Sequence, residues 1–142
     1  MATHQKRHIL YTIMAILFLA ALSTQAFAAL DISSPFICAF TKSFDCDNAE
    51  GCQEATSDSL GLPPFIKIDI AKNLLTAAVS QKAESRTETP IKSFHEVNGK
   101  LILQGIERRG WSAVIDKETG HMTVAASTDN EAVVLFGVCT AQ

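Results

Sequence analysis

Apolar and polar residues alternate along most of this chain in the manner of β-strands. The alternation is clearest after the paired prolines at positions 63 and 64, where every second residue is apolar. A period of two residues is typical of a strand with one buried face, and no segment keeps a helical period. The pattern therefore predicts an all-β protein, with one expected core face made by Ile66, Ile68, Ile70, Leu75, Ala77 and Val79.

Turn signals divide the chain into about eight expected strands. Asn98-Gly99 is the strongest of them, because a two-residue hairpin turn needs positive φ at both positions and these residues tolerate it. Later turns are expected at 108–110, 117–120 and 128–131. The strands between the turn signals are expected at 35–41, 65–70, 74–79, 89–97, 100–107, 111–116, 121–127 and 132–139.

Two of the expected strands, 100–107 and 132–139, are apolar on both faces. Such strands are covered on both sides, or one face meets a core and the other a ligand or partner. Residues 43–63, by contrast, are polar and contain few large apolar groups. This segment is expected to be a long loop, with at most one helical turn near residues 54–60.

The first 28 residues have the pattern of a secretory signal peptide. Lys6 and Arg7 precede an apolar run of residues 9–22, and the small-residue ending Ala26-Phe27-Ala28 is typical of a cleavage site. We expect cleavage after Ala28, because an apolar run of this length is short of the roughly 20 residues that a membrane span requires. The remaining segment, 29–142, has the size of a single domain.

All four cysteines lie in the expected exported part, and an even number in an oxidising compartment predicts two disulfides with three possible connectivities. The favoured pairs are Cys46 with Cys52, which closes a short loop, and Cys38 with Cys139, which ties the first strand to the last. A zinc site is the alternative, but the spacing lacks the close C-x-x-C pair that structural zinc prefers.

Consecutive hairpins and a bond between the first and last strands favour a small antiparallel meander barrel of about eight strands, lipocalin- or avidin-like in outline. A two-sheet β-sandwich is the alternative fold. One weak internal echo relates two of the hairpins: Asp69 and Asn73 match Asp116 and Gly120, so that each first strand ends in Asp and each turn ends in a residue that tolerates positive φ.

Without residues 1–28 the chain has ten basic and fifteen acidic residues, a formal charge of −5. Phosphate binding needs a concentrated basic field, so a nucleic-acid partner is not expected. No membrane span is expected after cleavage, and nothing in the sequence indicates a cofactor. The partner we expect is an unidentified protein or envelope component.

The segment Gly110-Trp111-Ser112-Ala113-Val114-Ile115-Asp116, followed by Thr119-Gly120 and by Phe136-Gly137-Val138-Cys139, resembles a pattern in small exported proteins of Gram-negative bacteria, notably alphaproteobacteria. The resemblance covers the last third of the chain together with the upstream cysteines. It implies a periplasmic or secreted protein built as a β-meander. It carries no catalytic or binding residues that could be transferred.

Few residues have the pattern of a chemical site. His95-Glu96 begins like the zinc-protease motif H-E-x-x-H, but Gly99 occupies the position of the second histidine. His95 and His121, with a carboxylate such as Glu96 or Asp116, do not by themselves define a metal site. The nucleophile motif G-x-S-x-G is absent from the sequence, so no catalytic residue is assigned.

The most suggestive surface group is Arg108, Arg109 and Trp111. Two guanidinium groups beside an indole could hold an anionic or aromatic ligand through paired hydrogen bonds and cation–π contact. The alternative is that Trp111 lies on a core face with Ala113 and Ile115 while the arginines form a solvated turn. We therefore expect an exported, non-catalytic binding or interaction module, with two alternatives: a carrier of an apolar or anionic small molecule, and a hydrolase of unfamiliar pattern.

Overall fold

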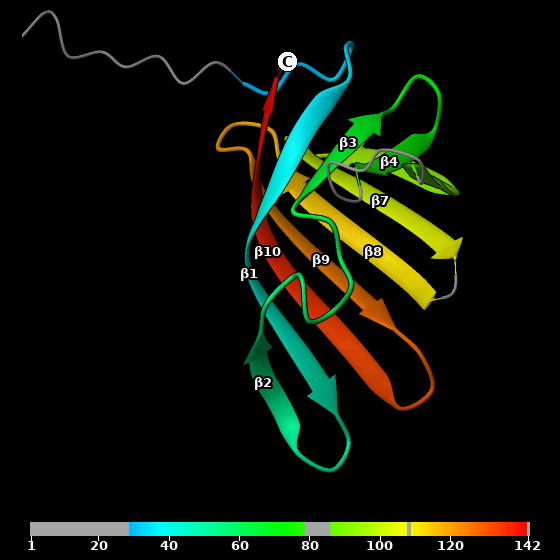
Figure 1. Ribbon diagram of the computed structural model, residues 1–142. Helices are drawn as coiled ribbons and strands as arrows, with labels where there is room; N and C mark the ends of the chain where they lie inside the picture. Colours follow the sequence, from blue (N-terminus) through cyan, green and yellow to red (C-terminus); the bar gives the residue numbers. More distant parts are fainter. Residues whose placement is uncertain (1–28, 79–85, 108, 142) are drawn as a thin grey trace, which may run out of the picture.

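The computed structural model describes residues 29–78, 86–107 and 109–141. The expected signal peptide and Arg108 therefore lie outside the described residues. The described chain is all-β, as predicted, and contains ten strands and no helix (Figure 1). The strands are β1 (Phe36–Asp47), β2 (Gly51–Ala55), β3 (Phe65–Asp69), β4 (Leu74–Ala78), β5 (Arg86–Pro90), β6 (Ser93–Val97), β7 (Lys100–Glu107), β8 (Arg109–Asp116), β9 (His121–Ser127) and β10 (Glu131–Ala141).

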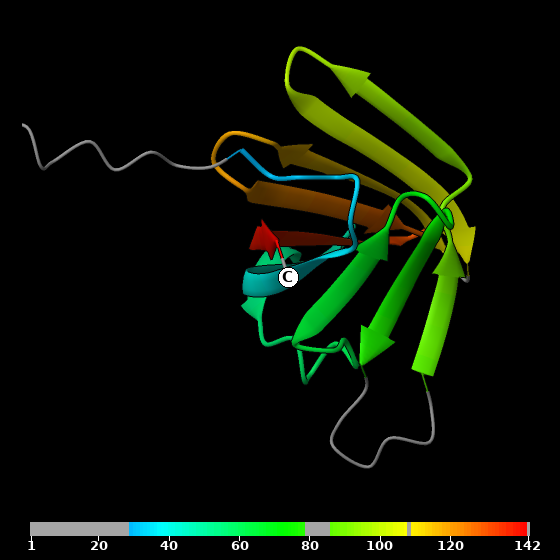
Figure 2. The same ribbon diagram turned by 90° about the horizontal axis from the view of Figure 1, so that it is seen from above.

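All strand pairs are antiparallel, and nine strands form one path in the order β5-β4-β3-β1-β10-β9-β8-β7-β6. The sheet curls along this path into a half-barrel, which is apparent when it is viewed from above (Figure 2). β2 lies off the path and pairs with the second half of β1, beyond the point where β3 ends its pairing. The predicted antiparallel meander is confirmed, and its first and last strands pair along their whole length.

The half-barrel is open between β5 and β6, although these strands follow each other directly in the chain. At this opening the two-residue corner joins the two arms of the sheet, and β5 also contacts β7. The Ile91 amide donates to the carbonyl of Asn73, the residue before β4, and the Lys92 amide donates to the Gln104 carbonyl in β7, both at 2.8 Å. The prediction of a single strand at 89–97 is therefore wrong. The two hydrogen bonds divide this segment into β5 and β6, which lie on different sides of the opening.

The expected loop at 43–63 is wrong for its first thirteen residues. β1 continues to Asp47 and turns into β2, while residues 56–64 remain irregular and contain one bond of helical type, from the Leu60 amide to the Thr56 carbonyl at 3.2 Å. The polar sequence concealed these strands because this part of the sheet has little cover on either face. Backbone pairing with the long strand β10, rather than burial of side chains, holds it extended.

The core lies where the two arms of the half-barrel face each other. Its fully buried members come from five strands and point to the concave side: Phe36, Cys38, Ile68, Leu101, Leu103, Ile115 and Met122. Of the predicted core face, Ile66, Ile68 and Ala77 are buried, and Val79 lies outside the described residues. Leu30, from the segment before β1, is also buried and donates its amide to the Lys117 carbonyl, so this segment covers one end of the core.

Both predicted disulfides are present, and each joins residues directly opposite each other on paired strands. Cys38 bonds to Cys139 between β1 and β10, and Cys46 bonds to Cys52 between β1 and β2. Two disulfides indicate an oxidising, extracytoplasmic environment. Within the described residues, no helix is long and apolar enough to cross a membrane.

Candidate functional site

The concave face of the half-barrel carries a groove of about 560 Å³, bounded on one side by residues 59–63 of the irregular segment. Alternation along the strands sends every second side chain into it, so apolar groups from both arms form its walls. We call this feature the groove. Its apolar walls are Phe40, Leu60, Leu62, Pro63, Ile66, Ile68, Leu75, Ala77, Trp111, Ala113, Val124, Ala126, Val133 and Leu135, and its polar side chains are Asp45, Ser59, Thr89, Arg109 and Glu131.

Trp111 forms part of the groove wall and also packs against the core. Its indole lies on Gly105, the residue directly opposite in β7, and a Cβ at that glycine would collide with the ring. The sequence left open whether Trp111 faces the core or a ligand. The structure places it on the concave face with Ala113 and Ile115, at the boundary between core and groove.

The indole Nε1 of Trp111 is buried and has no hydrogen-bond partner among the residues that the structure describes. A buried donor without an acceptor costs roughly 1–3 kcal/mol, so such atoms require a physical reason. In this structure the ring packs against Gly105, and this packing covers the Nε1 donor.

Arg109 lies two residues before Trp111 on the same face of β8 and also lines the groove. Its Nη2 atom contacts Glu131 Oε2 of β10 at 3.4 Å across the end of β9, and Arg109 belongs to β8 rather than to the turn expected at 108–110. Both side chains are exposed, and pairs of this kind contribute only about 0–1 kcal/mol to stability. The ion pair also borders a shallow depression beside the β9–β10 turn.

Asp45 is the third charged residue that the described chain places in the groove, and no sequence motif had singled it out. It lies in β1 between Gln53 of β2 and Val133 of β10. No hydrogen bond or ion pair to its carboxylate occurs in the described part of the chain. The sequence parity of Phe36 and Cys38 would turn Asp45 outward, and an irregularity between Phe40 and Lys42 reverses the parity, so that Asp45 shares the face of the buried Ser43.

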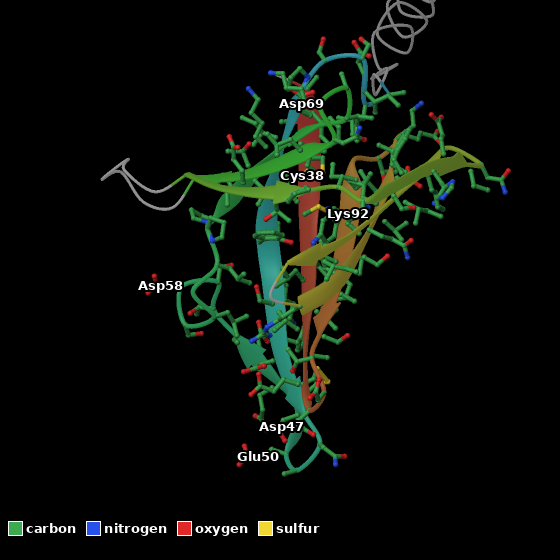
Figure 3. All side chains as sticks on the ribbon, turned by 90° about the vertical axis from the view of Figure 1, so that its right-hand side faces the viewer. Cys38, Asp47, Glu50, Asp58, Asp69 and Lys92 are labelled. Atoms are coloured by element: carbon green, nitrogen blue, oxygen red, sulfur yellow. A yellow bond between two sulfur atoms is a disulfide. The ribbon has the colours of Figure 1, made fainter. Side chains whose placement is uncertain are left out.

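Three other aspartates have a local structural role. Asp47, Asp69 and Asp116 each end a strand, and in each case Oδ1 accepts a hydrogen bond from the backbone amide three residues later, at 2.6, 3.1 and 2.9 Å. In each turn the fourth residue after the aspartate has positive φ: Gly51, Asn73 and Gly120. The echo between the Asp69 and Asp116 hairpins is confirmed, and the Asp47 turn is a third copy (Figure 3 labels Asp47 and Asp69 at opposite ends of the molecule).

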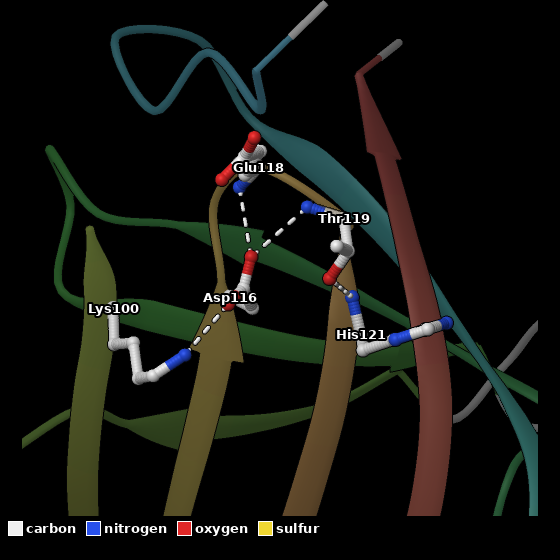
Figure 4. A network of polar contacts seen from close by, with 5 residues as sticks. All are labelled: Lys100, Asp116, Glu118, Thr119 and His121. Atoms are coloured by element: carbon white, nitrogen blue, oxygen red, sulfur yellow. Dashed lines mark hydrogen bonds and ion pairs between the residues drawn. The ribbon is translucent and has the colours of Figure 1, made fainter. Parts of the chain in front are cut away.

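Asp116 has the largest set of these contacts (Figure 4). Lys100, directly opposite in β7, donates to Oδ2 at 2.6 Å, and the amides of Glu118 and Thr119 donate to Oδ1. These donors stabilise the carboxylate, with the Lys100 bond first in importance, and they hold the pKa of Asp116 well below its ordinary value. The hydrogen bonds of this network hold the β8–β9 turn in place.

The two histidines considered as metal ligands do not lie in a cluster of metal-binding side chains within the described residues. His95 and His121 are exposed, Glu96 pairs with Lys117 at 2.7 Å, and Asp116 is occupied by Lys100. No group of three histidine, cysteine, aspartate or glutamate side chains suited to a metal ion occurs in residues 29–78, 86–107 and 109–141.

The strands that are apolar on both faces were expected to be covered on both sides, but the convex face of the sheet is partly exposed to solvent. Val114, Phe136 and Val138 are exposed there, and Phe136 meets Phe44 edge-to-face with ring centroids 6.2 Å apart.

Comparison with known proteins returned no matching family model, no matching curated protein and no matching solved structure. The groove and its few polar groups are therefore the basis for a functional proposal.

Proposed function

We propose that this protein is an exported, non-catalytic binding protein whose groove holds a small molecule with an apolar body. The observation that carries the proposal is the groove itself: about 560 Å³, with apolar walls and a small number of polar side chains. Small-molecule sites commonly enclose about 300–1,000 Å³ and have this composition. Each 100 Å² of apolar ligand surface removed from water would contribute roughly 2.5 kcal/mol.

Export is part of the proposal. The pattern of residues 1–28 supports a cleaved signal peptide, the disulfides support an oxidising compartment, and the resemblance to exported proteins of Gram-negative bacteria supports the periplasm or the cell exterior. Mass spectrometry of the protein secreted by its native host tests this part. The expected N-terminus is Ala29, and a mature chain that retains Met1 would contradict it.

Ala126 offers a direct test of the groove, because its neighbour Ala125 is a matched control. Ala126 lines the groove between Trp111 and Val133, whereas Ala125 lies on the opposite face of the same strand between Ser112 and Val134. Ala126→Phe should fill the groove and raise the dissociation constant of a neutral fluorescent probe such as N-phenyl-1-naphthylamine at least tenfold. Ala125→Phe should leave it unchanged.

Probe binding by the wild type that is equally insensitive to both substitutions would place the binding site elsewhere. Absence of probe binding by the wild type would contradict an apolar small-molecule site. Circular dichroism and urea unfolding of each variant establish that it is folded, and Ala126→Leu is the smaller replacement if Ala126→Phe does not fold.

A second candidate function is recognition of a protein partner through the β1–β2 hairpin. This hairpin projects from the half-barrel, carries its own disulfide, and has exposed side chains on β2 (Figure 1). Replacement of both Gln53 and Glu54 by arginine, which adds positive charge to β2, should abolish capture of an envelope component that the wild type retains. Glu118→Arg, in the exposed β8–β9 turn, is the control, and equal capture by both variants would contradict this function.

A further inference from the structure

The charges inside the groove select the kind of ligand that it can hold. This inference rests on the proposed function, because it assigns a ligand class to the same groove. Among the residues that the structure describes, three ionisable side chains line it: Asp45, Arg109 and Glu131. Arg109 and Glu131 neutralise each other through their 3.4 Å contact, which leaves the carboxylate of Asp45 as the charge without a partner among the described residues.

The surroundings of Asp45 increase this negative field. On the concave face, Asp47 lies directly opposite Glu131 in the β1–β10 pair, and its own carboxylate is engaged by two backbone amides of the β1–β2 turn. The lysine of the same strand, Lys42, has the opposite parity and pairs with Glu54 at 3.3 Å on the other face. Arg109 is therefore the one cation that the described residues contribute to the groove lining, and a carboxylate already holds it.

The aromatic groups of the groove add to the same preference. Phe40 and Trp111 both line it, and the faces of aromatic rings attract cations. An anionic ligand, by contrast, would have to displace Glu131 from Arg109, and it would then lie close to the carboxylates of both Glu131 and Asp45. Like charges brought together in a partly enclosed site repel each other more strongly than in open water.

We propose that the ligand is a cationic amphiphile, an apolar chain or ring system that carries one protonated amine. The apolar body would occupy the walls formed by Leu75, Val124 and Leu135, and the ammonium would lie beside Asp45 at the polar end of the groove. This assignment differs from the anionic ligand that the pair Arg108-Arg109 suggested in the sequence, because Glu131 compensates the charge of Arg109.

Three probes that share one twelve-carbon chain test the assignment: dodecylamine, dodecanol and dodecanoate, each below its aggregation limit. Their affinities are measured by displacement of N-phenyl-1-naphthylamine from the full mature chain at low salt. Dodecylamine should bind at least tenfold more tightly than dodecanoate, with dodecanol between them. High salt should reduce the difference, because it screens partly exposed charges.

Asp45→Asn should reduce the preference for dodecylamine over dodecanol at least fivefold and leave dodecanol binding unchanged. Asp58→Asn is the matched control, since Asp58 is exposed in the irregular segment (labelled in Figure 3) and does not line the groove. Arg109→Gln should increase the affinity for dodecylamine, because it frees Glu131 as a second carboxylate.

The failures of the two proposals are distinguishable. Equal binding of all three probes would overturn the charge assignment and leave the apolar groove in place. Tightest binding of dodecanoate, lost in Arg109→Gln, would overturn it in favour of an anionic ligand. Displacement by none of the three would overturn the proposed function itself.

Discussion

Cys38 and Cys139 are separated by 101 residues in sequence, yet they are directly opposite each other in the β1–β10 pair and are joined by a disulfide. Both are buried, and the bond lies between the first and the last strand of the sheet. The other disulfide, Cys46 to Cys52, spans only six residues of sequence and closes a hairpin that a tight turn already defines. The two bonds should therefore contribute very differently to stability.

Replacement of Cys38 and Cys139 by serine should lower the free energy of unfolding by about 2–5 kcal/mol, as for a native disulfide in a small exported domain. Replacement of Cys46 and Cys52 should cost roughly 2 kcal/mol less, because a shorter loop loses less entropy when it is closed in the unfolded chain. Urea unfolding midpoints of the two double variants measure the difference. Equal costs would show that loop length does not govern these bonds.

Gly105→Ala should displace the indole of Trp111, because the added Cβ would collide with the ring. Overpacking of this kind typically costs about 1–3 kcal/mol, and the Trp111 emission maximum should shift as the ring moves. Gly110→Ala is the control in the facing strand, since a Cβ there meets no atom within 4 Å. An unchanged emission spectrum in Gly105→Ala would contradict the packing of indole on glycine.

Asp116 should make stability depend on acid pH. Its folded-state pKa lies below the ordinary value of about 4, so its contribution is complete above that pH and is lost as the pH falls toward the folded-state pKa. Asp116→Asn should be less stable than the wild type at neutral pH and should lose less stability between roughly pH 5 and pH 2. Chemical unfolding at several pH values measures both.

The control for this prediction is Asp129→Asn, because no hydrogen bond to the Asp129 side chain occurs in the described residues. This variant should keep the pH dependence of the wild type. An Asp116→Asn variant with the same acid slope as the wild type would mean that the Lys100 contact does not persist in solution.

Gly120→Ala should cost more stability than Gly51→Ala, although both glycines follow an aspartate turn and both have positive φ. The left-handed conformation costs a non-glycine residue about 1–2 kcal/mol in each case. At Gly120 the added Cβ would also collide with the carbonyl oxygen of Cys139, whereas at Gly51 it meets nothing within 4 Å. Similar unfolding midpoints for the two variants would contradict the close approach of the β8–β9 turn to β10.

The sequence predicted those parts of the fold in which burial follows a period of two. Ile66 and Ile68 are buried as expected, and the Asn98-Gly99 hairpin forms where its turn residues require it. The pattern failed at β2 and the second half of β1, since exposed strands carry no hydrophobic period. One signal was available there, because Asp47 and Gly51 have the same spacing as Asp69 with Asn73 and Asp116 with Gly120.

The candidate site was predictable only in part. Arg109 and Trp111 were selected because they adjoin each other in sequence, and both line the groove, while Arg108 lies outside the described residues. Asp45 and Glu131 could not be selected in this way. They are distant in sequence and meet Arg109 in one groove only because β1, β8 and β10 curl around the same concave face.

Local chemistry in the sequence thus determined the strand periodicity, the turns and the number of disulfides, because each depends on neighbouring residues or on a count of thiols. Tertiary structure decided where the half-barrel opens and which charges lie together inside it. The position of the opening follows from the two hydrogen bonds that the backbone amides of Ile91 and Lys92 donate at the corner. The sign of the charge in the groove follows from the Arg109–Glu131 pair, a contact between strands that no sequence period encodes.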